Sequence, residues 1–150
     1  MGYYADITDC DFDIPENDQV LQVLKDLNHK YDSEKRGGAY ADGELKQRWF
    51  SWMDADYDQR VTSVREVFEL LGFDCDYNQD KGMVIIDGYD GKIGQEDLFL
   101  AAVAPFVDNG SYMEWRGEDG ELWRYEVRDG KLYILGAVIT WNNAVPVLTD

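Results

Sequence analysis

Residues 3–14 alternate apolar and polar side chains with a period of two, which is the pattern of a strand buried on one face. The apolar side chains change from odd to even positions near Thr8. A regular strand cannot change parity in this way, so we expect a β-bulge or a break at this point. Beyond it, Asp9, Asp11 and Asp13 are expected to face solvent in one row.

Apolar residues at helical spacing predict three helices farther along the chain. Asn17 or Asp18 is expected to cap the first helix at its N-terminus. Ser63 and Glu66 form a capping box for the second helix, and Gly72 ends it. The predicted helices are residues 15–31, 63–72 and 94–107.

Strand-like segments fill much of the remaining sequence. Residues 48–53 also fit helical spacing, but their aromatic content and the polar loop over residues 32–44 before them favour a strand. Turn sequences separate the last segments, so we expect a three-stranded meander. Residues 132–139 are apolar at both parities, which predicts a strand covered on both faces. The predicted strands are residues 3–14, 48–53, 82–92, 111–116, 122–128 and 131–141.

The order of these elements predicts an α+β fold. Strands and helices alternate at first, and the chain then runs through the meander. We expect a single mixed or antiparallel sheet that ends in a three-stranded meander, with about three helices packed on one face. Residues 1–150 have the length of one domain, and we expect a single domain.

The chain is strongly acidic, with 31 Asp and Glu against 14 Lys and Arg, for a formal net charge of -17. The excess is spread along the chain: residues 1–75 hold seventeen acids and eight bases, and residues 76–150 hold fourteen and six. This charge argues against direct binding to nucleic acid or to an anionic membrane, because phosphate recognition needs Lys and Arg. It favours a basic partner, and it exceeds the roughly 2–8 charges that keep a small domain in solution.

The cysteine and histidine residues do not predict catalysis. Cys10 and Cys75 are each flanked by aspartates, and we expect two free, buried thiols in a reducing cytosol. His29 lies near the end of a predicted helix, where a lone histidine is more typical of a surface residue than of a base. No apolar run approaches the roughly 20 residues of a membrane span, so we expect a cytosolic protein.

One stretch resembles a calcium-binding loop in part. Asp54, Asp56 and Asp58 match its positions 1, 3 and 5. Gln59, however, stands where glycine allows the sharp turn, and Arg65 stands where a glutamate supplies two oxygens. We therefore expect no bound metal. Since no catalytic or phosphate-binding motif is present either, we also expect no cofactor and no enzymatic activity.

A set of short motifs carries a family resemblance. The segments APFV, GSY, RGEDGELWRY and DGK follow one another within residues 93–132, and RWFSWM precedes them at residues 48–53. In these motifs the chain resembles a family of small uncharacterised proteins common in phages and mobile elements of Gram-positive bacteria. The resemblance implies a phage-related, cytosolic origin and supports a strand at residues 48–53. It implies no reaction, cofactor or site residue.

Two rows of aspartates lead to the first functional hypothesis. Residues on one face of a strand repeat every ~6.8 Å, which is comparable with the spacing of phosphates along a nucleic-acid strand. We expect a non-enzymatic inhibitor that imitates nucleic acid and occupies the basic cleft of a host nuclease or nucleic-acid-binding defence protein. The residues expected to bind this partner are Asp9, Asp11, Asp13, Asp54, Asp56 and Asp58.

The alternative hypothesis is a structural or assembly module. In that case the aromatic residues 3–4 and 49–53 form an interface with another protein, since exposed Trp and Tyr are good anchors. The acidic surface then only keeps the protein in solution.

Overall fold

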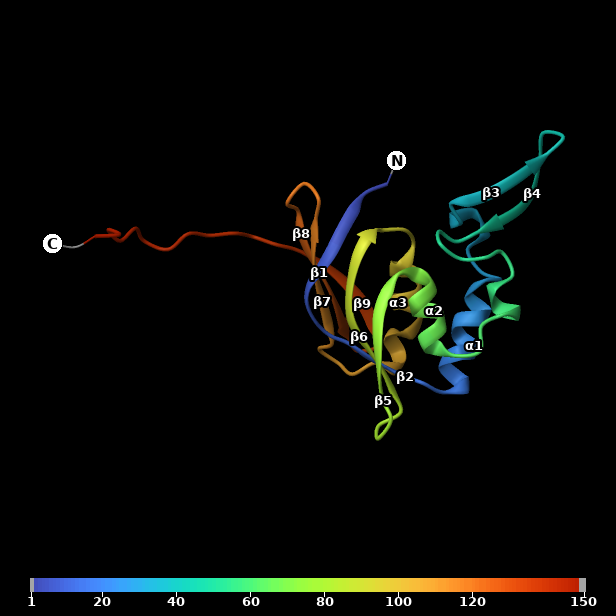
Figure 1. Cartoon of the computed structure of the whole chain (residues 1–150), viewed down its shortest axis with the longest axis horizontal. Helices are drawn as coiled ribbons and strands as arrows, with labels where there is room; N and C mark the ends of the chain where they lie inside the picture. The colour runs from blue at the N-terminus through green and yellow to red at the C-terminus, as the bar shows by residue number, and fades with distance from the viewer. Residues whose placement is uncertain (1, 149–150) are drawn as a thin grey trace.

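An antiparallel sheet of seven strands forms the centre of the protein in the computed structural model, which describes residues 2–148 (Figure 1). Its order is β5-β6-β1-β7-β8-β9, and the short β2 follows β1 and pairs with β6. Two further strands, β3 and β4, form a separate hairpin that projects from the body (Figure 1). The bounds are β1 Tyr4–Asp11, β2 Asp13–Pro15, β3 Gly37–Ala41, β4 Glu44–Trp49, β5 Phe73–Asn78, β6 Met83–Lys92, β7 Tyr112–Gly117, β8 Leu122–Arg128 and β9 Lys131–Gly136.

Three α-helices within residues 2–148 pack on one side of this sheet (Figure 1). The predicted α+β class, with a mostly antiparallel sheet, a final meander and three helices, is therefore confirmed. The prediction of a single sheet missed the β3–β4 hairpin. The helices are α1 Asp18–Leu27, α2 Val64–Leu71 and α3 Glu96–Val103, with short 3₁₀ turns at η1 Asp32–Glu34, η2 Tyr57–Gln59 and η3 Ala104–Phe106.

The helix ends follow the capping signals of the sequence. The Asn17 side chain accepts a hydrogen bond from the backbone N–H of Val20 at 2.9 Å and caps α1. Ser63 likewise accepts from the N–H of Glu66 at 3.0 Å and caps α2. Gly72 ends α2 with φ of 111°, a left-handed conformation that a residue without Cβ adopts readily.

A second carboxylate, that of Glu16, also caps α2. Glu16 lies between β2 and α1, and its oxygens accept hydrogen bonds from the backbone N–H groups of Val64 at 2.8 Å and Arg65 at 3.0 Å. Negative charge at this end also interacts favourably with the helix dipole. The linker that leaves the sheet is thereby fixed to the start of α2.

The predicted irregularity near Thr8 is confirmed. The register between β1 and β7 shifts between Ile7 and Asp9, as it does at a β-bulge. After the shift Cys10 is half-buried and Phe12 is fully buried on the helix side of the sheet. The bulge therefore explains the change of parity in the sequence. β1 lies in the middle of the sheet, between β6 and β7.

Aromatic side chains dominate the core between the sheet and the helices. Trp115 on β7 is 1% exposed, and its ring centroid lies 6.1 Å from that of Phe73 and 5.1 Å from that of Tyr89. Trp123 on β8 stacks against it at 6.0 Å. The opposite face of the meander carries charged pairs, as predicted, and Arg124 contacts Glu114 at 3.4 Å.

Several element boundaries differ from the predictions. The strand expected at residues 48–53 ends at Trp49, and it pairs with β3 inside the segment that was expected to be a loop. A tight turn makes this hairpin possible, since Asp42 and Gly43 both have positive φ, at 54° and 77°. The strand β5 was not predicted, although it starts directly after Gly72.

The last predicted strand is also shorter and more open than expected. It ends at Gly136, and residues 137–148 run away from the body as an extended segment without strand partners (Figure 1). Ile134 is 66% exposed, so the prediction of cover on both faces was wrong. Leu132 and Leu135 are half-buried, whereas the other large apolar side chains between residues 133 and 139 are exposed.

Within residues 2–148, no helix combines the length and the apolar character needed to cross a membrane.

Candidate functional site

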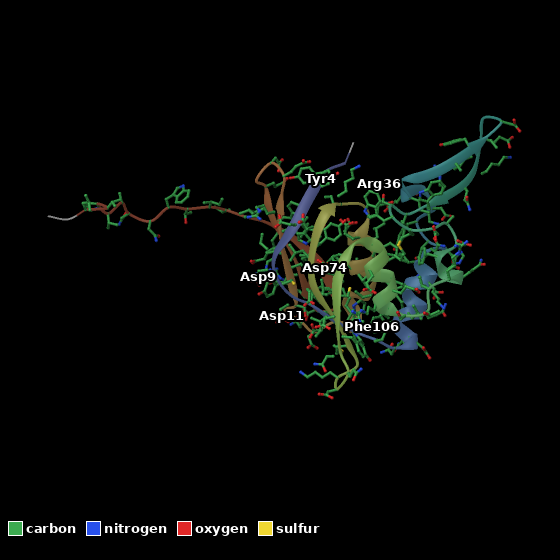
Figure 2. The ribbon with its side chains drawn as sticks, in the orientation of Figure 1. Tyr4, Asp9, Asp11, Arg36, Asp74 and Phe106 are labelled. Atoms are coloured by element: carbon green, nitrogen blue, oxygen red, sulfur yellow. The ribbon has the colours of Figure 1, made fainter. Side chains whose placement is uncertain are left out.

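The predicted row of aspartates lies on the face of the sheet that the helices leave open. In the register of β1 and β7, Asp9 pairs with Glu114 and Asp11 pairs with Tyr112. Residues directly opposite in an antiparallel pair share a face, so all four point to the open side. Asp9 and Asp11 are exposed, and Figure 2 labels both along β1. Asp9 accepts a hydrogen bond from the Tyr112 hydroxyl at 3.0 Å.

Asp13 continues the row on β2. It pairs with Ile85 of β6, and it is half-buried. Burial raises the pKa of Asp13, and the nearby carboxylate of Asp11 raises it further, while Lys81 acts in the opposite direction. The structure thus brings Asp9, Asp11 and Asp13 to one face, where their negative charges repel one another.

Three aspartates that the sequence analysis did not select extend this face. Ile85 pairs with Asp13 on one edge of β6 and with Asp76 on the other, so these three residues lie side by side on neighbouring strands. Asp74 on β5 and Asp87 on β6 are also exposed near this position. The alternation of aspartate and apolar residues around Cys75 matches that around Cys10, and it is the signal that could have identified them.

We call six of these aspartates the acidic face, namely Asp9, Asp11, Asp13, Asp74, Asp76 and Asp87. Within residues 2–148, none of them forms a salt bridge with Lys, Arg or His. The neighbouring strands differ, because Arg116 contacts Asp6 at 2.9 Å and Arg124 contacts both Glu114 and Glu126. The open side therefore carries ion pairs over β7, β8 and the first half of β1, and the acidic face on β5, β6, β2 and the second half of β1 has none.

The second predicted row does not form. Asp54, Asp56 and Asp58 lie in and around the loop between β4 and η2 and not on a strand. Asp54 and Asp56 both contact Arg60, at 3.8 Å and 3.1 Å. The three carboxylates are thus not available as a regular array.

Asp58 has a structural role in joining this loop to the end of α1. It accepts hydrogen bonds from the Asn28 side-chain amide at 2.7 Å and pairs with His29 Nε2 at 2.8 Å. Burial alone would raise the pKa of Asp58, but the hydrogen bonds from Asn28 and His29 outweigh it and lower the pKa. His29 itself is largely exposed and contacts Asp58 on the surface.

The two cysteines are free and half-buried on the inner side of the sheet. Burial raises the pKa of the Cys75 thiol to about 12. Burial, followed by the charges of Asp87 and Asp9, raises the pKa of the Cys10 thiol. Both thiols therefore stay protonated at neutral pH, and the thiolate needed for nucleophilic attack is disfavoured. Within residues 2–148, no group of three or more His, Cys, Asp or Glu is arranged to hold a metal ion.

The aromatic segments that were expected to form an interface are partly buried. Phe50 and Met53 belong to the core, and Trp52 is 46% exposed. Tyr4, at the start of β1, is 52% exposed. The most exposed aromatic side chain among residues 2–148 is instead Trp141, at 90%, in the segment that follows β9.

On geometry, the acidic face is suited to bind cationic groups. Carboxylates repeat every ~6.8 Å along a strand, and Asp13 and Asp76 lie two strands apart, at ~9.6 Å, on either side of Ile85. Such a rigid array matches a basic surface more closely than a flexible acidic tail does, because little side-chain freedom remains to be lost. In comparisons with known proteins, no family model matches the chain, and neither a curated protein nor a solved structure matches it significantly.

Proposed function

We propose that the protein is a non-enzymatic binding protein whose acidic face occupies the nucleic-acid site of a basic protein. The observation that carries this proposal is the set of six aspartates, without salt bridges within residues 2–148, on neighbouring strands of one sheet. The partner is a nucleic-acid-binding protein or nuclease, and the protein inhibits it by nucleic-acid mimicry.

Electrostatics supports a functional reason for this face. The raised pKa of Asp13 reports that its charged form is disfavoured in the folded protein, first by burial and then by Asp11. A basic partner would replace this repulsion with attraction and would also accelerate association. A surface that served solubility alone would not need its charges on neighbouring strands, because scattered charges serve equally well.

The family resemblance of residues 93–132 favours a phage-related role in the host cytoplasm. A small protein that blocks a host defence protein or nuclease fits this origin. The target enzyme is therefore expected to be one that binds nucleic acid through Lys and Arg, since this surface is complementary to clustered carboxylates.

The experiment measures, by fluorescence anisotropy, whether the protein displaces a labelled DNA duplex from basic bacterial DNA-binding proteins and nucleases. The full chain should displace DNA, and its apparent affinity should fall steeply between 50 and 200 mM salt, as contacts to a polyanion do. The triple variant Asp9→Asn, Asp11→Asn, Asp13→Asn should weaken displacement by about 10- to 100-fold, taking roughly 0.5–1 kcal/mol for each charge.

A matched control removes the same charge elsewhere. The triple variant Asp42→Asn, Asp54→Asn, Asp56→Asn lowers the acidity equally but leaves the acidic face intact. It should displace DNA like the wild type. Equal losses in both variants would mean that net charge alone acts, and full activity of the first variant would exclude the acidic face as the binding site.

A further inference from the structure

The C-terminal arm, defined as residues 137–148, is the most apolar exposed part of the described chain. The whole stretch 132–149 contains no charged residue, in a chain that is 30% charged. Val138, Trp141 and Val147 are 89%, 90% and 99% exposed. The arm leaves the end of β9 and extends away from the body (Figure 1). Its large apolar side chains are therefore little covered by their own domain.

The arm has the sequence of a strand. Ile139, Trp141, Val145 and Val147 stand at odd positions, and Thr140, Asn142 and Ala144 stand at even positions. Val138, Asn143 and Leu148 depart from this alternation. This period of two is typical of a strand that buries one face. The odd apolar positions are Ala137, Ile139, Trp141, Val145 and Val147.

The strand β9 offers an edge on which another strand can be placed. One edge of β9 pairs with β8, and within residues 2–148 no strand pairs with the other edge. Tyr133 and Ile134 are 44% and 66% exposed along it. An open, apolar strand edge is a template for pairing with a further chain. The arm continues directly from this edge strand and cannot fold back onto it without a turn, which its extended path does not make (Figure 1).

We propose that two copies of this chain exchange arms, so that the arm of each copy adds to the free edge of β9 in the other. From Leu132 onward, β9 and the arm form one continuous uncharged segment, and two such segments placed antiparallel about a two-fold axis bring each arm onto the partner's β9. Two molecules that each carry a net charge of -17 repel each other over most of their surface. The uncharged segment is where they approach with the least repulsion.

The base of the arm supplies a further contact. A pocket of about 340 Å³ lies there, lined by the apolar side chains of Leu122, Trp123 and Leu135, with Ala137 at its border. Thr8, Glu114 and Arg124 also belong to its lining. An apolar side chain from the incoming arm fits such a pocket. Four large apolar side chains on the odd face of each arm, at roughly 100 Å² each, bury about 800 Å² over the two arms. With the comparable area that they cover on the partner, the total is on the order of 1,600 Å², which is the size of a specific interface.

Pro146 limits the assembly to a pair. Proline lacks the N–H that a strand donates to its neighbour, so it is tolerated on an edge strand and not within a sheet. Once the arm has added to β9, it becomes the new edge strand, and Pro146 hinders the addition of a third chain. The product is a closed dimer and not a filament.

Sedimentation and light scattering of the full chain test this proposal. Between 1 and 100 µM the mass should rise to twice 17.3 kDa, and dimerisation should strengthen with salt, because salt screens the repulsion. This salt dependence is opposite to that of the proposed binding to a basic partner. Either proposal can therefore fail without the other.

Two sets of substitutions separate strand exchange from general stickiness. Ile139→Asp with Trp141→Asp should abolish the dimer while leaving the melting temperature of the monomer unchanged, because both side chains are exposed. Asn142→Pro with Asn143→Pro keeps every apolar side chain, but it removes at least one N–H that points to the partner, because alternate groups do so. It should also weaken the dimer at least 10-fold.

Other results would contradict the exchange of arms. A wild-type chain that is monomeric at 100 µM, or one that forms aggregates without a fixed mass, would overturn the proposal. A dimer that survives both double variants would place the contact on another surface. A monomer that sediments with uncharged lipid vesicles through its arm would give the arm a different occupant and would also overturn it.

Discussion

Neutralising Asp13 should stabilise the protein while it weakens binding. Asp13 is half-buried and carries a pKa raised by burial and by Asp11, so Asp13→Asn removes an unfavourable charge without changing the size of the side chain. A unit charge ~6.8 Å away contributes about 0.6 kcal/mol in water-like surroundings, and salt screens part of it. With a part of the burial penalty added, we expect a gain of about 0.5–1 kcal/mol at pH 7.

The pH dependence of this gain in stability shows whether the charge of Asp13 causes it. Because the pKa of Asp13 is raised in the folded state, the stability that its proton provides is fully present below the unfolded pKa and is lost as pH rises through the folded pKa. The advantage of Asp13→Asn over the wild type is therefore largest at neutral pH and narrows as the carboxyl becomes protonated.

Urea denaturation at pH 7, 6, 5 and 4.5 measures this difference. Dilute samples are needed at the acid end, because the pI is about 4.2. The melting temperature at pH 7 should rise by about 1–3 °C. The control Asp42→Asn, at an exposed turn, should change stability by less than about 0.5 kcal/mol at every pH. A variant that is less stable than the wild type at pH 7, or a difference that does not change with pH, would refute the reasoning.

Three further predictions concern the fold. Glu16→Ala should destabilise the protein by about 1–2 kcal/mol, because two N–H groups at the start of α2 lose their acceptor, and chemical denaturation would show it. Gly72→Ala should cost about 1–3 kcal/mol, since φ is 111° and an added Cβ would lie 2.9 Å from the Tyr89 ring; a melting temperature equal to that of the wild type would contradict this. Asp58→Asn should destabilise at pH 7 but not at pH values below its lowered pKa, because the wild type loses the same charge as pH falls, and paired thermal melts across pH would measure it.

The sequence predicts those parts of the fold that depend on local patterns. The change of parity near Thr8 identified the bulge, and the capping residues Asn17 and Ser63 identified two helix starts. The meander followed from its turns and its alternating charges. The strand β5 escaped because it follows Gly72 without a loop, and β3 escaped because its residues are mostly polar or small. Local patterns do not show which strands become neighbours.

The same limit explains why the sequence revealed only part of the acidic face. Strand parity placed Asp9, Asp11 and Asp13 on the open side, but the contribution of Asp76 depends on β5 and β2 pairing with opposite edges of β6, which only the topology reveals. Aspartates at every second position look identical in a loop and in a strand. In the loop after β4, Asp54 and Asp56 form ion pairs with Arg60, and the spacing of the aspartates does not reveal these pairs.

The central place of β1 has a consequence for synthesis. β1 is made well before β6 and β7, yet it lies between them, and the hydrogen bond from Tyr112 to Asp9 joins residues 103 positions apart. The ribosome releases the two neighbours of β1 long after β1 itself has left the exit tunnel. Long-range pairing of this kind slows folding. During translation the aspartates near its end would help to keep this waiting segment from pairing with other nascent chains.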